Sequence, residues 1–171
     1  MSILKIAKLG HPVLYRKAKP VENITEPNIK KLIHNMIETM LDAKGIGLAA
    51  PQVGINTRVL VLGTTSEFQM SYFNPIIAAV GAAEEYFIDG CLSYPGLFVK
   101  IKRPKDIAIV WWDADGEQHD MKYNQMVSRI LQHEIDHLNG ITFLERANRY
   151  HLEKARKELK LYNRRKRKIN A

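Results

Sequence analysis

The chain has 171 residues, of which 46% are hydrophobic and 26% are charged, a size and balance typical of one globular domain with a sizeable core. Its single cysteine, Cys91, excludes an intrachain disulfide and favours a reducing compartment. No stretch reads as a signal peptide or a bilayer-spanning segment, so we expect a cytoplasmic protein, bacterial-type or inside an organelle, without a membrane partner.

The net charge of +8 is confined to the C-terminal end. Residues 149–171 contain ten Lys or Arg and two Glu, whereas residues 1–148 contain 16 basic and 16 acidic residues. We therefore expect a neutral unit over 1–148 and a basic helix or tail over 149–171 that extends the same domain. Such a segment favours an acidic partner, although a solvated basic end is the alternative.

The first predicted element is a helix over "TEPNIKKLIHNMIETMLDAKG". Its apolar residues recur at helical spacing from Ile29 to Leu41, Pro27 suits the first turn, and Gly45 ends the helix. Strand-like runs then start at Thr57, Ser71, Glu84, Leu97 and Asp106, and "DADG" predicts a turn into "EQHDMKY".

A second helix is predicted from Asn124, a good N-cap, to Asn139, with Gly140 as its stop. Its apolar side is assigned to Val127, Ile130, Leu131 and Leu138. A third, basic helix starts near Asn148. This order predicts an α+β fold, with antiparallel strands packed around the second helix and a basic helix at the C-terminus.

The second helix contains "HEIDH". His133 and His137 lie four residues apart, so their Cβ atoms are neighbours at about 5–6 Å and both imidazoles can bind one ion. Glu134 is displaced by one residue and reaches the water on the ion instead, which is the H-E-x-x-H arrangement of metallohydrolases. The alternative is an amphipathic helix with two histidines at its edge.

A third protein ligand is needed for a catalytic site with an open position. In the metzincin frame that position is Phe143, which cannot bind a metal. Glu153 and Glu158 stand among lysines and arginines on a predicted solvated face. Cys91 remains as a strong thiolate donor, although a small buried hydrophobe is the alternative reading of a lone cysteine.

Three motifs resemble those of the peptide deformylases: "GIGLAAPQVG" at 45–54, "DGCLS" at 89–93 and "QHEIDHLNG" at 132–140. The resemblance implies removal of the N-formyl group from the N-terminal methionine of newly synthesised proteins. It also implies one divalent ion, Fe²⁺ as the physiological metal with Zn²⁺, Ni²⁺ or Co²⁺ as substitutes, held by Cys91, His133 and His137.

The resemblance further implies that Glu134 is the general base and later the acid. The side-chain amide of Gln52 and the backbone N–H of Leu92 are implied to form the oxyanion hole. The peptide would lie as an added strand along the first two motifs. Its implied contacts, for some of which core packing is the alternative, are Gly45, Ile46, Gly47, Phe87, Gly90, Met126 and Ile130.

Two positions depart from the family pattern. Asp89 stands where the family usually has glutamate, and the shorter side chain predicts a looser or water-bridged pair with Arg103. Phe98 stands where some members have an arginine near the substrate backbone, so a polar contact to the peptide is expected to be missing.

Two other functions stay open from the sequence. One is a zinc endopeptidase with a downstream glutamate ligand, and the other is an RNA-binding module based on the basic tail. Deformylases are thought to dock on the ribosome through a C-terminal helix. The resemblance therefore implies that residues 149–171 bind ribosomal RNA near emerging N-formylmethionyl peptides.

Overall fold

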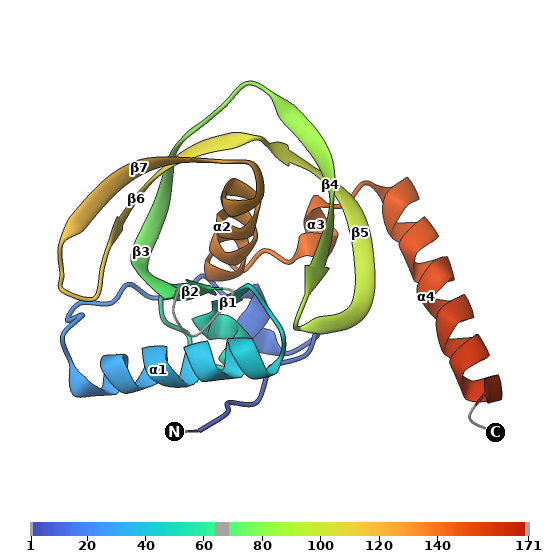
Figure 1. The fold of residues 1–171 in the computed structure, drawn as a ribbon, viewed down its shortest axis with the longest axis horizontal. Coiled ribbons are helices and arrows are strands. Elements are labelled where there is room, and N and C mark those ends of the chain that lie inside the picture. The colour runs from blue at the N-terminus through green and yellow to red at the C-terminus, as the bar shows by residue number, and fades with distance from the viewer. Residues whose placement is uncertain (1, 64–68, 170–171) are drawn as a thin grey trace.

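The computed structural model describes residues 2–63 and 69–169 and shows an α+β fold (Figure 1). Its elements are η1 (Pro12–Tyr15), α1 (Pro27–Asp42), β1 (Gly47–Ala49), η2 (Ala50–Val53), β2 (Val59–Gly63), β3 (Gln69–Val80), β4 (Glu84–Cys91), β5 (Tyr94–Pro104), β6 (Asp106–Trp112), β7 (Gln118–Asn124), α2 (Gln125–Leu138), α3 (Phe143–Arg146) and α4 (Arg149–Ile169). The last two residues of the predicted tail, 170–171, lie outside the described residues.

The strands form two antiparallel sheets. The larger sheet has five strands in the order β1-β2-β3-β6-β7, and the smaller sheet pairs β4 with β5. The predicted α+β class with a C-terminal helix is therefore correct. The sequence did not reveal β1, η2 and α3, because each has only three or four residues and depends on its tertiary contacts more than on local propensity.

Strand β2 is a continuous apolar run because both of its faces are covered. Every residue from Val59 to Gly63 is buried. Val59 and Val61 pack with α1, whereas Leu60 and Leu62 pack with α2 on the opposite face. The alternation of side chains along a strand explains this division. The five-stranded sheet is thus held between α1 and α2.

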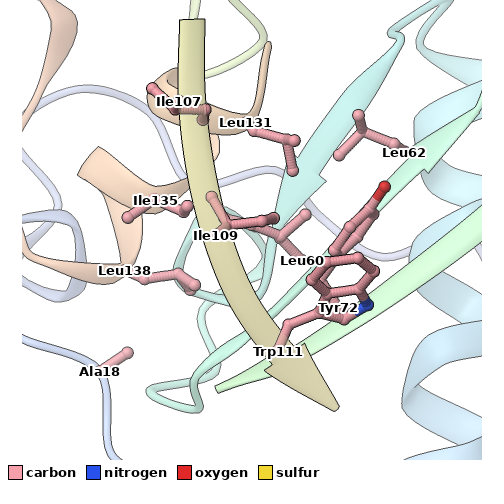
Figure 2. Packing of buried hydrophobic residues seen from close by; sticks show 11 residues of the cluster. Ala18, Leu60, Leu62, Tyr72, Ile107, Ile109, Trp111, Leu131, Ile135 and Leu138 are labelled. Carbon is pink, nitrogen blue, oxygen red and sulfur yellow. The ribbon is translucent and has the colours of Figure 1, made fainter. Parts of the chain in front are cut away.

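Helix α2 packs against the sheet through a stripe that includes Leu131, Ile135 and Leu138. Figure 2 shows these side chains on the α2 side of Ile109 of β6, in the same cluster of buried residues. The spacing of four and then three residues is the period of a helix face. The prediction that Val127 belongs to the apolar side is wrong: Val127 is 40% exposed, and the stripe continues through Ile135 instead. The face with His133 and Glu134 is left for the site.

The predicted end of α2 is confirmed at Asn139, with Gly140 in the left-handed region at φ 73°. Asn124 takes the N-cap position, but its side chain makes no capping hydrogen bond. A Cβ at Gly140 would lie 2.9 Å from the carbonyl carbons of both Tyr15 and Arg16. Only glycine therefore fits this turn, for both conformational and steric reasons.

Gly140→Ala is accordingly expected to lower the free energy of unfolding. The left-handed backbone contributes about 1–3 kcal/mol of strain, and the displaced η1 backbone adds to it. The matched control is Gly116→Ala, because Gly116 has φ 83° but open space at its Cβ position. Urea unfolding should show a larger loss for Gly140→Ala. Equal losses would mean that the contact with η1 is unimportant.

Helix α4 packs along β5 through Leu152, Ala155 and Leu159 (Figure 1). The prediction that Leu161 joins this contact is wrong, since it is 54% exposed and lies off the stripe formed by the other three. Residues 164–167, from the terminal basic run, are exposed. No helix in the described parts of the chain is both long and apolar enough to cross a bilayer.

Candidate active site

The end of β4 meets one face of α2 at a cluster of three side chains of the types that bind metal ions. Cys91 Sγ lies 3.2 Å from His137 Nε2, and the ring centroids of His133 and His137 are 5.0 Å apart. One ligand atom from each of these residues lies within 4.8 Å of the others. A thiolate with two imidazoles suits zinc, iron, cobalt or nickel. The residues present therefore fit a divalent ion.

The surroundings of the two histidines shift their pKa values in opposite directions. Burial, together with the positive charges of His133 and Arg103, lowers the pKa of His137 well below 6.5, so its imidazole is in the neutral form that binds metals. Burial alone would lower the pKa of His133 as well, but Asp89 and Cys91 outweigh it and raise this pKa to about 10. The groups that hold a proton on His133 would equally stabilise a metal ion.

Glu134 lies next to the ligands and is 4% exposed. Burial raises its pKa to about 7, against the lowering effects of His133 and Arg103. Its Oε2 is buried without a hydrogen-bond partner among the described residues. A carboxyl group that titrates near neutrality is suited to general acid–base catalysis.

Strand β1 passes close to Glu134. A Cβ at Gly47 would stand 2.7 Å from Glu134 Oε1 and 2.8 Å from Ile130 Cγ2. Glycine at this position therefore allows the backbone of β1 to form a wall of the site. This close approach gives a physical reason for one glycine of the first motif.

The side-chain amide of Gln52 is held in one orientation. Its Oε1 accepts a hydrogen bond from the Ala49 N–H at 2.7 Å, and its Nε2 donates to Cys91 Sγ at 3.5 Å. Gln52 is 1% exposed, and its amide nitrogen faces the cluster of Cys91, His133 and His137. Leu92 follows Cys91 and lines the same cleft.

A chain of charged residues, buried except for Arg146, supports the cluster from behind. Asp89 Oδ2 lies 3.6 Å from His133 Nδ1 and 2.9 Å from Arg103 Nε. Arg103 Nη1 contacts Asp136 at 2.8 Å, and Asp136 contacts Arg146 at 2.6 Å. Burial alone would raise the pKa of Asp89, but His133 and Arg103 lower it below its usual range. The carboxylate is therefore ionised and oriented toward His133, as metal-binding histidines require.

The contacts of Arg103 show that the predicted geometry of its pair with Asp89 is wrong. The pair of Asp89 and Arg103 is direct, not loose or bridged by water. Asp136 binds the same guanidinium, which keeps the arginine within reach of the shorter aspartate. The sequence analysis missed Asp136 and Arg146. The available signal was a second acid inside "HEIDH", at a helix position three residues after His133.

The cluster opens into a cleft of about 460 Å³ between β1, β4 and α2. All of the expected substrate contacts line it: Gly45, Ile46, Gly47, Phe87, Gly90, Met126 and Ile130. Phe98 also lines the cleft and is 63% exposed. The sequence analysis did not anticipate Ile88 or Arg129 among the lining residues. Arg129 could have been noticed as a charged residue one turn before His133 on the site face.

The glutamates required by the endopeptidase alternative are not at this cluster. Glu153 is exposed and pairs with Arg149 at 2.9 Å, and Glu158 is exposed on α4. Cys91 is the third residue beside the two histidines. The endopeptidase alternative, and the alternative that this chain is only an RNA-binding module, gain no support.

A cysteine and two histidines beside a buried carboxyl group, in an open cleft of an α+β fold, are a combination typical of metallohydrolases. The sequence model of the polypeptide deformylase family matches residues 3–153. The peptide deformylase of Natranaerobius thermophilus is 43% identical over 86% of this chain and 94% of its own.

Solved structures of peptide deformylases are also similar to this chain. A peptide deformylase crystal structure from Plasmodium falciparum has a TM-score of 0.86 and 34% identity, covering 98% of this chain and 99% of its own. A Met-Ala-Ser-bound structure of a class I type b peptide deformylase from Acinetobacter baumannii has a TM-score of 0.80 and 30% identity, covering 85% and 98%. The chain belongs to the polypeptide deformylase family.

Proposed function

We propose that this protein is a peptide deformylase that hydrolyses the N-formyl group from the N-terminal methionine of newly synthesised proteins and releases formate. The observation that carries the proposal is the convergence of Cys91, His133 and His137 within 4.8 Å, with Glu134 and Gln52 on the same cleft. Family membership supports the same reaction.

In this proposal Cys91, His133 and His137 hold one divalent ion, with Fe²⁺ as the physiological metal and Zn²⁺, Ni²⁺ or Co²⁺ as substitutes. The bound ion supplies Lewis-acid activation of water, whose pKa falls from about 15.7 to about 7 on such ions. Glu134 accepts the water proton and then delivers it to the leaving amine. The pKa of Glu134 near 7 suits both steps.

The oxyanion that forms from the formyl carbonyl needs fixed donors. Gln52 Nε2 is one candidate, because the Ala49 N–H occupies the amide oxygen and so directs the NH₂ group toward the site. The backbone N–H of Leu92 is the second. One such donor is worth about 2.7–4 kcal/mol of transition-state stabilisation.

The peptide is proposed to bind as an added strand in the cleft. Of the described strands, β1 pairs only with β2 and β4 pairs only with β5, so each presents an edge that a peptide can extend. The methionine side chain would enter the pocket near Ile46, Phe87, Met126 and Ile130. The relative from Acinetobacter baumannii has been crystallised with Met-Ala-Ser.

Residues 1–148 are the catalytic unit in this proposal, with antiparallel strands around the H-E-x-x-H helix, and residues 149–171 extend the same domain. Helix α2 contacts the larger sheet, and its histidines contact β4 of the smaller sheet. The expected location is the cytoplasm or an organelle interior, where nascent formylated chains emerge.

The test is formate release from formyl-Met-Ala-Ser. Protein prepared without oxygen should be loaded with Fe²⁺, Zn²⁺, Ni²⁺ or Co²⁺ in separate samples. Activity should depend on the ion, with Fe²⁺ above Zn²⁺, and disappear when a chelator removes it. Metal-loaded, folded protein that releases no formate with any ion would refute the proposal.

The basic C-terminal segment is proposed to bind ribosomal RNA. A second cleft of about 670 Å³ lies between α4 and β5. Four of its lining residues are cations, Arg156, Lys160, Arg164 and Arg167, and one is aromatic, Tyr94. The four cations can bind RNA phosphates, and the aromatic ring can stack on an unstacked base.

Truncation after Asn163 removes five basic residues. The shortened protein should keep its kcat/KM on formyl-Met-Ala-Ser but co-sediment less with ribosomes, and most clearly at low salt, because phosphate contacts dominate such binding. The hypothesis fails if the truncated and full-length proteins co-sediment equally.

Two triple variants of α4 that lose the same charge test whether the position of the basic residues matters for ribosome binding. Lys160, Arg164 and Arg167 line the second cleft, whereas Lys154, Lys157 and Arg165 are exposed residues of α4 outside its lining. Each set is changed to glutamine. The first set should weaken ribosome binding more than the second. Equal effects would mean that total charge alone determines binding.

A further inference from the structure

Two large apolar side chains stand exposed at the rim of the active-site cleft. Phe98 of β5 is 63% exposed and Ile88 of β4 is 64% exposed, and both line the cleft. By contrast, Val99 and Ile101 of the same hairpin are fully buried. Single exposed apolar residues are common on protein surfaces, but an adjacent pair in the wall of a binding cleft indicates an apolar partner.

The register of the hairpin places the two side chains next to each other. Gly90 pairs with Phe98 and Ile88 pairs with Lys100, so Ile88 and Phe98 are diagonal neighbours on one face of the two-stranded sheet. A Cβ at Gly90 would lie 2.7 Å from Cε1 of Phe98. The ring of Phe98 therefore lies against the β4 backbone, beside Ile88, and forms part of the rim with it.

This face of the hairpin is turned away from α2. Phe87, the neighbour of Ile88 along β4, lies 4.6 Å from the guanidinium carbon of Arg129 on α2. Successive side chains of a strand point to opposite faces. The cleft therefore has an α2 side near Phe87 and an outer side near Ile88 and Phe98.

We infer that Ile88 and Phe98 bind the side chain of the second residue of the formylated peptide and select an apolar residue there. The inference rests on the proposed deformylase function, in which the methionine side chain enters the pocket on the α2 side. In an extended peptide the next side chain points to the opposite face. It therefore meets Ile88 and Phe98, whichever way the peptide runs along β4.

An apolar second residue gains from this surface by removing apolar area from water, on the peptide and on the rim together. Leucine and asparagine test this directly, because the two side chains have nearly the same size and branching but opposite polarity. Asparagine would lose part of its hydration on the rim, where neither Ile88 nor Phe98 offers a side-chain hydrogen bond in return. Neutral residues are the right probes, since Lys44 also lines the cleft and would act on charged ones.

The experiment compares kcat/KM of the metal-loaded full-length protein on formyl-Met-Leu-Ser and formyl-Met-Asn-Ser. The leucine peptide should exceed the asparagine peptide by about three- to tenfold. That is below the roughly 10–200-fold that one methylene is worth in an enclosed pocket, because this surface is open on one side. The difference should lie mainly in KM, since the contact is made equally in the ground state and the transition state.

Substitutions at the rim test the two residues. Phe98→Thr should bring the leucine-to-asparagine ratio close to one, whereas Phe98→Leu, which keeps an apolar side chain, should retain part of it. Ile88→Thr should lower the ratio as well. Threonine suits a strand, and both positions are exposed. Each ratio compares two peptides on the same enzyme sample, so a change in the fraction of folded or metal-loaded protein cancels.

Tyr86→Thr is the matched control. Tyr86 lies two residues before Ile88 on the same face of β4 and is 43% exposed, but it does not belong to the cleft lining formed by the described residues. It should leave the ratio as in wild type. A wild-type ratio at or below one, an unchanged ratio in Phe98→Thr, or an equal loss in Tyr86→Thr would overturn the inference. If Phe98→Thr does not fold, an unchanged ratio in Ile88→Thr overturns it instead.

Failure of the proposed function would be visible separately. If no peptide releases formate, binding of Met-Leu-Ser and Met-Asn-Ser to the metal-loaded protein is measured by calorimetry. Tighter binding of Met-Leu-Ser to wild type, lost in Phe98→Thr, would support the apolar rim without hydrolysis. Equal binding of the two peptides would reject it.

Discussion

Glu134→Gln is expected to retain the metal and the fold while turnover falls by about 10²–10⁴, the usual contribution of a positioned acid–base group. Glutamine has nearly the same shape but cannot accept the water proton. The Oε2 of Glu134 makes no hydrogen bond within the described structure. Replacing this oxygen by an amide nitrogen therefore breaks no hydrogen bond of the fold. Because its pKa is about 7, replacing the carboxyl group by a neutral amide does not leave a strong ion pair broken.

The measurements are kcat for formate release, metal content per chain, and urea unfolding. Glu153→Gln is the control, since Glu153 is exposed, forms an ion pair with Arg149 at the surface, and is one of the two downstream glutamates of the endopeptidase alternative. It should leave kcat and metal content unchanged. Near-normal turnover in Glu134→Gln would show that another group or bulk water is the base.

Cys91→Ala should abolish stoichiometric metal binding and, with it, formate release. Two imidazoles remain, but the charged ligand is lost. Loss of a residue that merely orients a ligand already lowers metal affinity by about 10–100-fold, so loss of a ligand itself should exceed that range. Competition with a chelator gives the affinity, and metal analysis gives the stoichiometry.

A Cys91→Asp variant distinguishes binding from reactivity. The carboxylate keeps a negative ligand beside His137 but is harder than a thiolate, so metal binding should be partly retained and turnover altered. A Cys91→Ala variant with full metal content would show that the ion is bound elsewhere and would remove the basis of the proposed centre.

The sequence was most informative where function restricts residue type. The spacing of His133 and His137, with Cys91 in a second motif, was enough to predict a metal site, and the structure brings these three side chains together. Whether they bind the ion stays a prediction. The apolar run of β2 and the glycine after α2 likewise indicated their elements, because burial and a positive φ restrict composition strongly.

Features that depend on packing could not be read from local patterns. Val127 and Ile135 are both apolar residues of α2, and only contact with the sheet determines which one is buried. The direct pair of Asp89 and Arg103 depends on Asp136, which is distant in sequence from both. Arg129 was missed for the same reason, since its partners Glu85 and Phe87 lie on another element.

The site joins two sheets that share no strand pairing among the described strands. Cys91 belongs to the β4–β5 hairpin, whereas the histidines belong to the helix that packs on the larger sheet. An ion bound by all three would therefore act as a crosslink between two structural halves. Occupancy would stabilise the hairpin against local opening by mass action. Loss of the ion would then loosen one wall of the substrate cleft and remove the catalyst at the same time. A single metal-binding equilibrium would therefore control both the stability of the cleft and its activity.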